Sequence, residues 1–221
     1  MANSLRSAPT SAVLQRLLHE DQEHDPRAFA AVGPIAEIWD LDTAARAETF
    51  KTVYMSVSAD GGDLLYLLAR ATGARTVVES GTSFGGSAIY LASAVRDNGG
   101  GLVVGTELQP EKAAAAREAF AAADVAELID LREGDARTTL SEVPDTVDLV
   151  LLDGWPDLAL PVLRVLEPAL RTGTLILVDD VDMDFGRNVH GELLTYLTDP
   201  SNGYLSVKLP VGDGMQAAVR L

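Results

Sequence analysis

Hydrophobic residues near the N-terminus recur at helical spacing. Apolar side chains within residues 11–20 fall on one face of a helix. Similar patterns extend over residues 27–38, where Gly33-Pro34 introduces a break, and over residues 43–52. The first quarter of the chain is therefore predicted to be helical.

From Ser58 onward, segments of helical spacing alternate with short apolar runs that have the length of buried strands. Ser58 is a suitable N-cap for a helix that Gly73 ends, and Pro110 can open a later helix because its missing N–H is not needed there. The alternation predicts a parallel sheet with helices on both faces. The predicted strands are residues 76–79, 102–107, 129–132, 147–152 and 174–178, and one more helix is predicted over residues 160–170.

The last part of the chain departs from this alternation. Tyr204–Leu209 and Met215–Leu221 are joined by the turn Pro210–Gly214, which predicts a β-hairpin with an antiparallel edge. The expected fold class is α/β, a Rossmann-like doubly wound sheet of seven strands, mostly parallel, with N-terminal helices. We divide the chain into a helical lid or oligomerisation segment over residues 1–54 and a ligand-binding domain over residues 55–221.

Composition narrows the possible functions. The 221 residues contain no cysteine, which excludes disulfides, thiolate metal sites and cysteine nucleophiles. The formal net charge of -16 repels polyanions, so we expect no nucleic-acid partner. No apolar run is long enough to span a bilayer, and residues 1–10 lack the apolar core of a signal peptide. We therefore expect a cytoplasmic protein without a membrane partner.

The first predicted strand leads into a glycine-rich turn, the usual ligand-binding position in an open α/β sheet. Gly81 is followed by Gly85 and Gly86, a spacing unlike the Gly-x-Gly-x-x-Gly of nicotinamide sites, so a nicotinamide oxidoreductase is a distant alternative. Glu79 lies just before the turn, where it would repel a diphosphate but attract an ammonium or sulfonium group. S-adenosylmethionine carries both of these groups.

The second predicted strand ends at Glu107, whose carboxylate can accept hydrogen bonds from both hydroxyls of a ribose. An acid at this position also occurs in nicotinamide sites, and a glycine-rich turn between a strand and a helix also occurs without a ligand. The combination of Glu79, the turn and Glu107 favours S-adenosylmethionine as the cofactor.

Five segments in order resemble the small metal-dependent O-methyltransferases of the catechol and caffeoyl-CoA type. They are Met55–Gly62, Val78–Ser87, Leu151–Trp155, Val178–Asp180 and Leu209–Gly214. The resemblance implies methyl transfer from S-adenosylmethionine to a hydroxyl group of a small catechol-like or phenolic acceptor.

The resemblance also implies where the cofactor binds. The segment at Met55 would lie over the methionine part, the glycine-rich turn would hold the amino-acid group, and the following strand ends would bind ribose and adenine. The residues assigned in this way are Met55, Val57, Glu79, Gly81, Ser83, Ser87, Glu107, Leu108, Asp135, Ala136, Asp153 and Trp155.

Three aspartates follow predicted strands that end at the same edge of the sheet. Oxygen ligands of this kind suit Mg²⁺, with Mn²⁺ or Ca²⁺ as alternatives. The resemblance implies that Asp153, Asp179 and Asp180 hold the metal, that the metal chelates two adjacent acceptor oxygens, and that Asp153 is catalytic. The family usually has Asn at the position of Asp180. Alternatively, Asp179 and Asp180 only cap the end of a strand.

Pro156 is the main departure from the family, which has a lysine general base three residues after the first metal-binding aspartate. Three explanations are open: the metal acidifies the hydroxyl sufficiently, His190 replaces the lysine rather than being a surface residue, or the acceptor is not a catechol. Two other functions are also compatible with proline at this position. One is a metal-independent methyltransferase, and the other is a protein that binds S-adenosylmethionine without turnover.

Several N-terminal features have alternative interpretations. His19 and His24 stand among acidic residues, and we interpret this cluster as a solvated helix end rather than a metal site. Trp39 either covers the acceptor or packs a helix against the core. The apolar residues of the segment 5–18 are expected to pack across the two-fold axis of a homodimer, since members of the family often dimerise.

Overall fold

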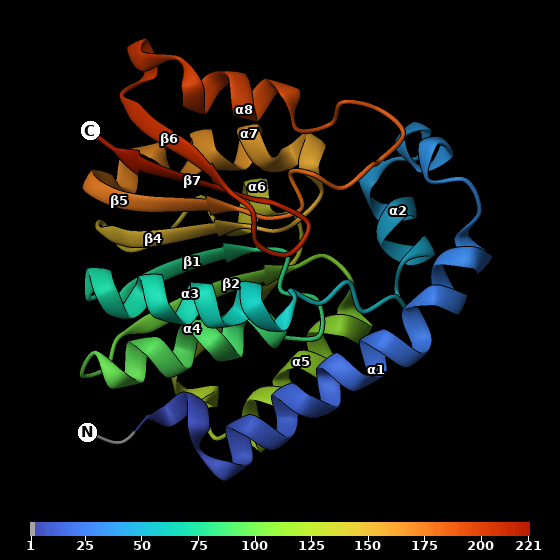
Figure 1. The fold of residues 1–221 in the computed structure, drawn as a ribbon, viewed down its shortest axis with the longest axis horizontal. Coiled ribbons are helices and arrows are strands. Elements are labelled where there is room, and N and C mark those ends of the chain that lie inside the picture. Colours follow the sequence, from blue (N-terminus) through green and yellow to red (C-terminus); the bar gives the residue numbers. More distant parts are fainter. Residues whose placement is uncertain (1–2) are drawn as a thin grey trace.

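The computed structural model describes residues 3–221 and contains a seven-stranded sheet with the order β3-β2-β1-β4-β5-β7-β6 (Figure 1). The pairs β1–β2, β1–β4, β2–β3 and β4–β5 are parallel, whereas β7 is antiparallel to both β5 and β6. The predicted fold class and the C-terminal hairpin are confirmed. The strands are β1 (Thr76–Ser80), β2 (Leu102–Glu107), β3 (Ile129–Glu133), β4 (Val147–Leu152), β5 (Leu170–Val178), β6 (Tyr204–Leu209) and β7 (Met215–Arg220).

Helices occupy most of the remaining chain. The α-helices are α1 (Ala8–Val32), α2 (Thr43–Thr49), α3 (Ala59–Thr72), α4 (Gly86–Asp97), α5 (Pro110–Ala122), α6 (Ala136–Thr139), α7 (Pro156–Leu166) and α8 (Gly191–Thr198). Short 3₁₀ turns are η1 (Ser4–Arg6), η2 (Ile35–Asp40), η3 (Ala126–Leu128), η4 (Glu167–Ala169) and η5 (Pro200–Asn202).

Two helices differ from the prediction in their bounds. Helix α1 is continuous over 25 residues and includes Pro26, where two separate patterns were expected. The predicted helix 160–170 begins earlier, because Pro156 occupies the first turn, where its missing N–H costs no hydrogen bond. It ends at Leu166, and β5 already starts at Leu170.

Alternating side chains of the buried strands enter two separate cores. Val77 of β1 belongs to the core beneath α1, α3, α4 and α5, whereas Val78 belongs to the core beneath α7 and α8. Both residues are fully buried, as expected for a parallel sheet covered on both faces. The helices thereby hold the strand ends in fixed positions.

The apolar residues of the segment 5–18 do not match the prediction that they form a dimer interface. Leu5, Val13, Leu14 and Leu17 are buried within the chain itself, in the core formed with α4 and α5. Since these side chains are already covered, they are not available to a second subunit. The predicted homodimer stays a prediction.

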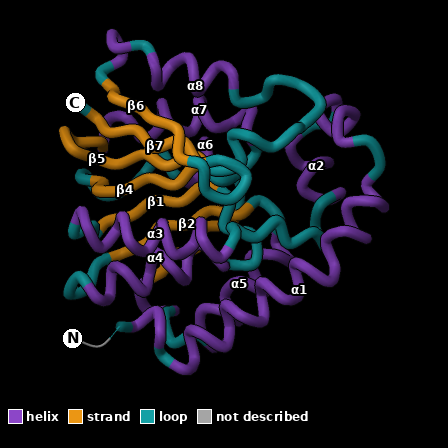
Figure 2. The backbone as a smooth tube through the Cα atoms, in the orientation of Figure 1, coloured by secondary structure: helices purple, strands orange, loops and turns teal. Residues whose placement is uncertain are grey.

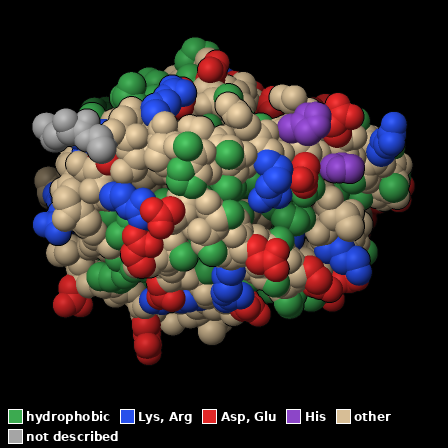
Figure 3. Space-filling model, turned by 90° about the horizontal axis from the view of Figure 1, so that it is seen from below, with side chains coloured by type: hydrophobic (Ala, Val, Ile, Leu, Met, Phe, Trp, Pro, Cys, Tyr) green, Lys and Arg blue, Asp and Glu red, His purple; other side chains and the backbone are tan. Residues whose placement is uncertain are grey.

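Loops gather at the carboxyl ends of the strands, where α2 and the C-terminal part of α1 also lie (Figures 1 and 2). Among the residues that the structure describes, no helix has the length and apolar character needed to cross a membrane. On the face seen in Figure 3, acidic and basic side chains are interspersed rather than gathered into one basic patch.

Candidate active site

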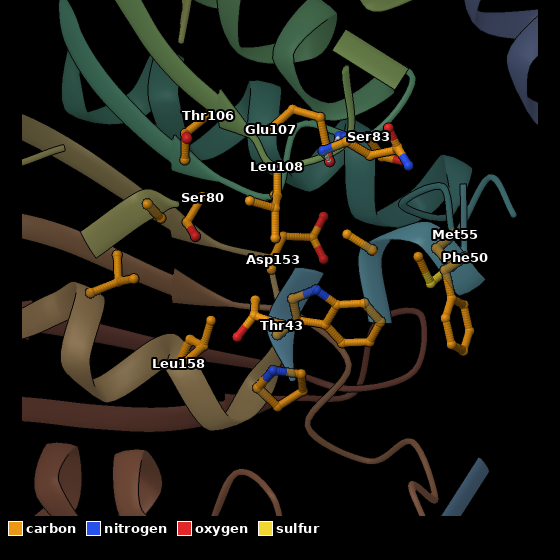
Figure 4. Close-up of a pocket in the computed structure, with 18 of the residues that line it drawn as sticks. Thr43, Phe50, Met55, Ser80, Ser83, Thr106, Glu107, Leu108, Asp153 and Leu158 are labelled. Carbon is orange, nitrogen blue, oxygen red and sulfur yellow. Dashed lines mark hydrogen bonds between the residues drawn. The ribbon is translucent and has the colours of Figure 1, made fainter. Parts of the chain in front are cut away.

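A pocket opens at the carboxyl ends of β1, β2, β4 and β5, where the strand order reverses between β1 and β4. Figure 4 shows the carboxyl group of Asp153 pointing into this space, with Glu107 and Ser83 on one side and Phe50 and Met55 on another. The pocket is thus built from the sheet and from the N-terminal helices together.

The turn after β1 requires glycine at position 81. Gly81 has a φ of 90°, and a Cβ atom at this position would collide with the backbone carbonyl oxygen of Asp153. The two strand ends can therefore approach closely, which brings Asp153 next to the glycine-rich turn.

Glu79 is fully buried at the end of β1. Its Oε2 accepts a hydrogen bond from Thr82 Oγ1 at 2.7 Å, whereas Oε1 has no partner among residues 3–221. Burial raises the pKa of Glu79 to about 7, although the nearby hydroxyl groups of Ser87 and Thr82 act in the opposite direction. A buried oxygen without a donor is costly, so the site fits a ligand that brings an ammonium group.

Glu107 at the end of β2 receives two backbone hydrogen bonds. Its Oε2 accepts from the N–H of Ser83 at 2.7 Å, and its Oε1 accepts from the N–H of Gln109 at 2.8 Å. Each carboxylate oxygen keeps a second acceptor position. Glu107 is therefore held in place while it remains able to accept hydrogen bonds from ligand hydroxyls.

Asp153, Asp179 and Asp180 line the same pocket. Burial and the charges of Asp179 and Asp180 raise the pKa of Asp153 well above its usual value. Burial and the charges of Asp179 and Asp213 raise the pKa of Asp180. Oxygen donors that repel one another in this way attract a cation. Within residues 3–221, however, no group of three acidic or histidine side chains is arranged to hold a metal ion.

Asp180 adopts a left-handed backbone conformation with a φ of 60°. Asn and Asp are the residues other than glycine that are most enriched in this conformation. The exchange of the family's usual Asn for Asp is thus compatible with the local backbone, and it changes mainly the charge.

Aromatic rings form another wall of the pocket. The Trp155 ring lies edge-on to those of Phe50 and Trp39, with centroid distances of 5.3 and 6.2 Å. Trp39 Nε1 donates a hydrogen bond to the carbonyl oxygen of Phe185 at 3.0 Å. Trp155 and Phe185 line the pocket, and Trp39 packs behind them.

His190 lines the pocket from the segment before α8 and is only 6% exposed. Neither ring nitrogen makes a well-formed hydrogen bond within the described residues. Burial lowers the pKa of His190, although the backbone of Asp180 acts in the opposite direction. The alternative that His190 is a surface residue is therefore wrong, because the chain folds it inward beside Phe185.

The prediction that the acidic residues around His24 are solvated is wrong for Asp25. Its side chain is buried, and its two oxygens accept hydrogen bonds from the N–H groups of Tyr54 and Met55, both at 2.7 Å. The helical pattern did not reveal this role because the donors are backbone groups 29 and 30 residues away.

Most of the residues predicted for the cofactor lie around the pocket. Val57, Glu79 and Ser87 are buried and do not line it. The predicted residues that do line it are Met55, Gly81, Ser83, Glu107, Leu108, Asp135, Ala136, Asp153 and Trp155. Lining residues that carry no recognisable sequence signal are Thr43, Ala47, Phe50, Gln109, Lys112, Leu158 and Val162.

Comparison with known proteins identifies the family. Residues 78–181 match a family described as a methyltransferase domain. A protein of Mycolicibacterium smegmatis named as an O-methyltransferase is 31% identical over 176 residues, which cover 72% of this chain and 80% of that protein. The chain is a member of the O-methyltransferase family. The predicted resemblance to class I, S-adenosylmethionine-dependent O-methyltransferases is confirmed.

Solved structures of O-methyltransferases and related proteins have the same fold. Cofactor-bound Rv0187 from MTB has a TM-score of 0.68 and 26% sequence identity, covering 88% of this chain and 89% of that one. TomG from Streptomyces achromogenes, an O-methyltransferase of tomaymycin synthesis in complex with S-adenosylmethionine, has a TM-score of 0.65 and 26% identity, covering 87% and 89%.

Proposed function

We propose that the protein transfers the methyl group of S-adenosylmethionine to a hydroxyl group of a small phenolic or catechol-like molecule. The main support is one pocket in which Glu107 and Asp153 face an aromatic wall, beside the unpartnered oxygen of Glu79. The reaction breaks the bond between the methyl carbon and sulfur, forms a bond between that carbon and the acceptor oxygen, and releases the hydroxyl proton. Alignment of the three atoms is the main contribution that a protein makes to such a displacement.

Each part of the cofactor has a proposed binding group. Glu79 and Ser87 hold the amino-acid group, and Gly81 and Ser83 line it. Met55 and Val57 lie over the methionine part. Glu107 accepts hydrogen bonds from the ribose hydroxyls. The adenine lies between the side chains of Leu108, Asp135, Ala136 and Trp155, all of which line the pocket.

We further propose that Asp153, Asp179 and Asp180 hold a divalent cation, with Mg²⁺ the best match to carboxylate donors. Such a cation lowers the pKa of a bound hydroxyl and fixes its position. The mutual repulsion of these carboxylates supports the proposal. Because the three groups are not arranged around one point, their side chains must reorient to bind it.

Pro156 occupies the position at which the family has its lysine general base, and proline cannot take over this role. Pro156 is buried at the start of α7 and lines the pocket, where it offers no proton acceptor. His190 lines the same pocket with two ring nitrogens that lack partners, so it is available to bind an acceptor hydroxyl. A catechol hydroxyl acidified by a cation needs little further help from a base.

The N-terminal segment is proposed to act as a lid. Thr43, Ala47 and Phe50, all within residues 1–54, line the pocket, whereas the methyltransferase domain proper comprises residues 55–221. The lid would exclude water from the acceptor. We propose the cytoplasm as the site of action.

The deciding experiment measures S-adenosylhomocysteine formation with a panel of catechols and other phenols, in Mg²⁺ and in excess EDTA. Turnover that requires Mg²⁺ and is lost in Asp153→Asn supports the proposal. Turnover that is unchanged by EDTA and in Asp179→Ala would instead indicate a metal-independent methyltransferase. Tight S-adenosylhomocysteine binding without product from any acceptor would favour a binding protein.

A further inference from the structure

Hydrogen bonds attach the segment 54–56 to helix α1. Asp25 accepts from the N–H of Tyr54 with Oδ1 and from the N–H of Met55 with Oδ2, at 2.7 Å each. Asp21 accepts from the N–H of Ser56 at 3.0 Å. Three consecutive backbone donors therefore point toward carboxylates of one helix.

Met55 has an unfavourable backbone conformation, which contacts from the rest of the chain must stabilise. Its φ of 46° lies in the left-handed region, which residues other than glycine, Asn and Asp adopt rarely. A conformation of this kind persists when the surroundings impose it, and it is often found beside a ligand. Met55 lines the pocket, so the strained backbone lies at the binding site.

The other side of the segment is attached to the glycine-rich turn. Ser83 Oγ donates to the carbonyl oxygen of Tyr54 at 2.7 Å and accepts from Lys112 Nζ at 3.2 Å. The N–H of Ser83 binds Glu107, the residue proposed for the ribose. A continuous chain of hydrogen bonds thus runs from α1 to the cofactor loop.

We infer that Asp25 is a positioning residue for S-adenosylmethionine, which holds Met55 in its left-handed conformation without touching the cofactor. The inference rests on the proposed placement of the methionine part beside Met55. A carboxylate suits this role because it offers an acceptor to each of two N–H groups, whereas an amide offers one acceptor and one donor. The N-terminal helix thereby controls cofactor affinity.

The test measures S-adenosylhomocysteine binding to the full chain by calorimetry, which needs no acceptor. Asp25→Asn is expected to weaken binding roughly tenfold, because one N–H loses its charged acceptor and faces an amide NH₂. The KM for S-adenosylmethionine rises similarly, and kcat at saturation stays nearly unchanged. Glu23→Gln, an exposed acid on the same helix, is the matched control and leaves binding unchanged.

Met55→Gly distinguishes positioning from a general structural role. Glycine adopts the left-handed conformation without a Cβ penalty, so Asp25→Asn should weaken binding less than about threefold in the Met55→Gly background. Equal losses in both backgrounds, or unchanged binding in folded Asp25→Asn, would overturn the inference.

If Asp25→Asn does not fold, Asp25→Glu replaces it. Glutamate keeps the charge, but its longer side chain moves the carboxylate away from the N–H groups of Tyr54 and Met55, so binding is expected to weaken about threefold. Unchanged binding in folded Asp25→Glu would overturn the inference. Failure of the unaltered protein to bind S-adenosylhomocysteine would contradict the proposed function instead. The two failures are therefore distinguishable.

Discussion

Arg46 donates two hydrogen bonds to the carboxylate of Asp157, at 2.9 and 2.8 Å, while its guanidinium lies over the rings of both Trp39 and Trp155. The Arg46 side chain is 4% exposed and that of Asp157 is 39% exposed. This pair joins α2 of the proposed lid to the first turn of α7, directly after Pro156. It also supports the back of the Trp155 ring, which faces the pocket.

Arg46→Lys is expected to lower the free energy of unfolding by about 1–3 kcal/mol, after allowance for the exposure of Asp157. Lysine cannot make the paired hydrogen bonds or place a planar, delocalised cation over both indole rings. Denaturant unfolding measures the effect. Arg6→Lys is the control, because the Arg6–Asp63 pair is largely exposed and should contribute little. An equal decrease in the free energy of unfolding in both variants would show that the effect of Arg46→Lys does not come from burial of the Arg46–Asp157 pair.

The pH dependence of cofactor binding should follow Glu79. Burial raises its pKa from 4.5 to about 7, so the free protein carries a neutral Glu79 at lower pH. An ammonium ligand prefers the carboxylate, and S-adenosylhomocysteine affinity is therefore expected to increase roughly tenfold from about pH 6 to about pH 8. Calorimetry at both pH values tests this. Glu79→Gln should bind S-adenosylhomocysteine weakly, and its affinity should no longer depend on pH. If the affinity of Glu79→Gln still increased with pH, the assignment of the pH dependence to Glu79 would be wrong.

Asp180→Asn is expected to stabilise the protein in EDTA at about pH 8 by roughly 1–2 kcal/mol. The raised pKa of Asp180 means that folding disfavours its charged form, so the penalty is present at high pH and disappears as the pH falls below the unfolded value. The gain should therefore vanish near about pH 4.

Two control variants test whether the charge of Asp180 causes this effect. Asp180→Ala should gain less stability than Asp180→Asn, because alanine tolerates the left-handed backbone poorly. Asp145→Asn removes an exposed carboxylate and should have no comparable effect. Thermal unfolding at both pH values provides the measurement, and a gain in Asp180→Asn that is equal at high and low pH would argue against charge repulsion.

Acceptor charge should influence turnover. Five acidic residues line the pocket, against one lysine, which lies on the side of Glu107 and Ser83. At low salt, kcat/KM for a catechol with a carboxylate side chain is expected to be roughly fivefold lower than for 4-methylcatechol, with the difference shrinking in added salt. The same kcat/KM for both acceptors at every salt concentration would show that these carboxylates do not select the acceptor.

Local patterns in the sequence were sufficient to predict the sheet and the residues that lie at the ends of its strands. Apolar runs of strand length alternating with helical segments leave few parallel arrangements, and in these the strand ends meet at one edge. Glu79, Glu107 and Asp153 were predicted together for this reason, and Glu107 and Asp153 line one pocket with Glu79 buried next to it.

Contacts between distant segments were decided by the tertiary structure alone. Asp25 was interpreted as a solvated acid at a helix end, and no role was predicted for Arg46, because nothing within a few residues distinguishes either of them. Their partners are the N–H groups of Tyr54 and Met55 and the carboxylate of Asp157, the last 111 residues from Arg46. Burial of a charge depends on which surfaces the folded helices bring together, and a helical period carries no information about that.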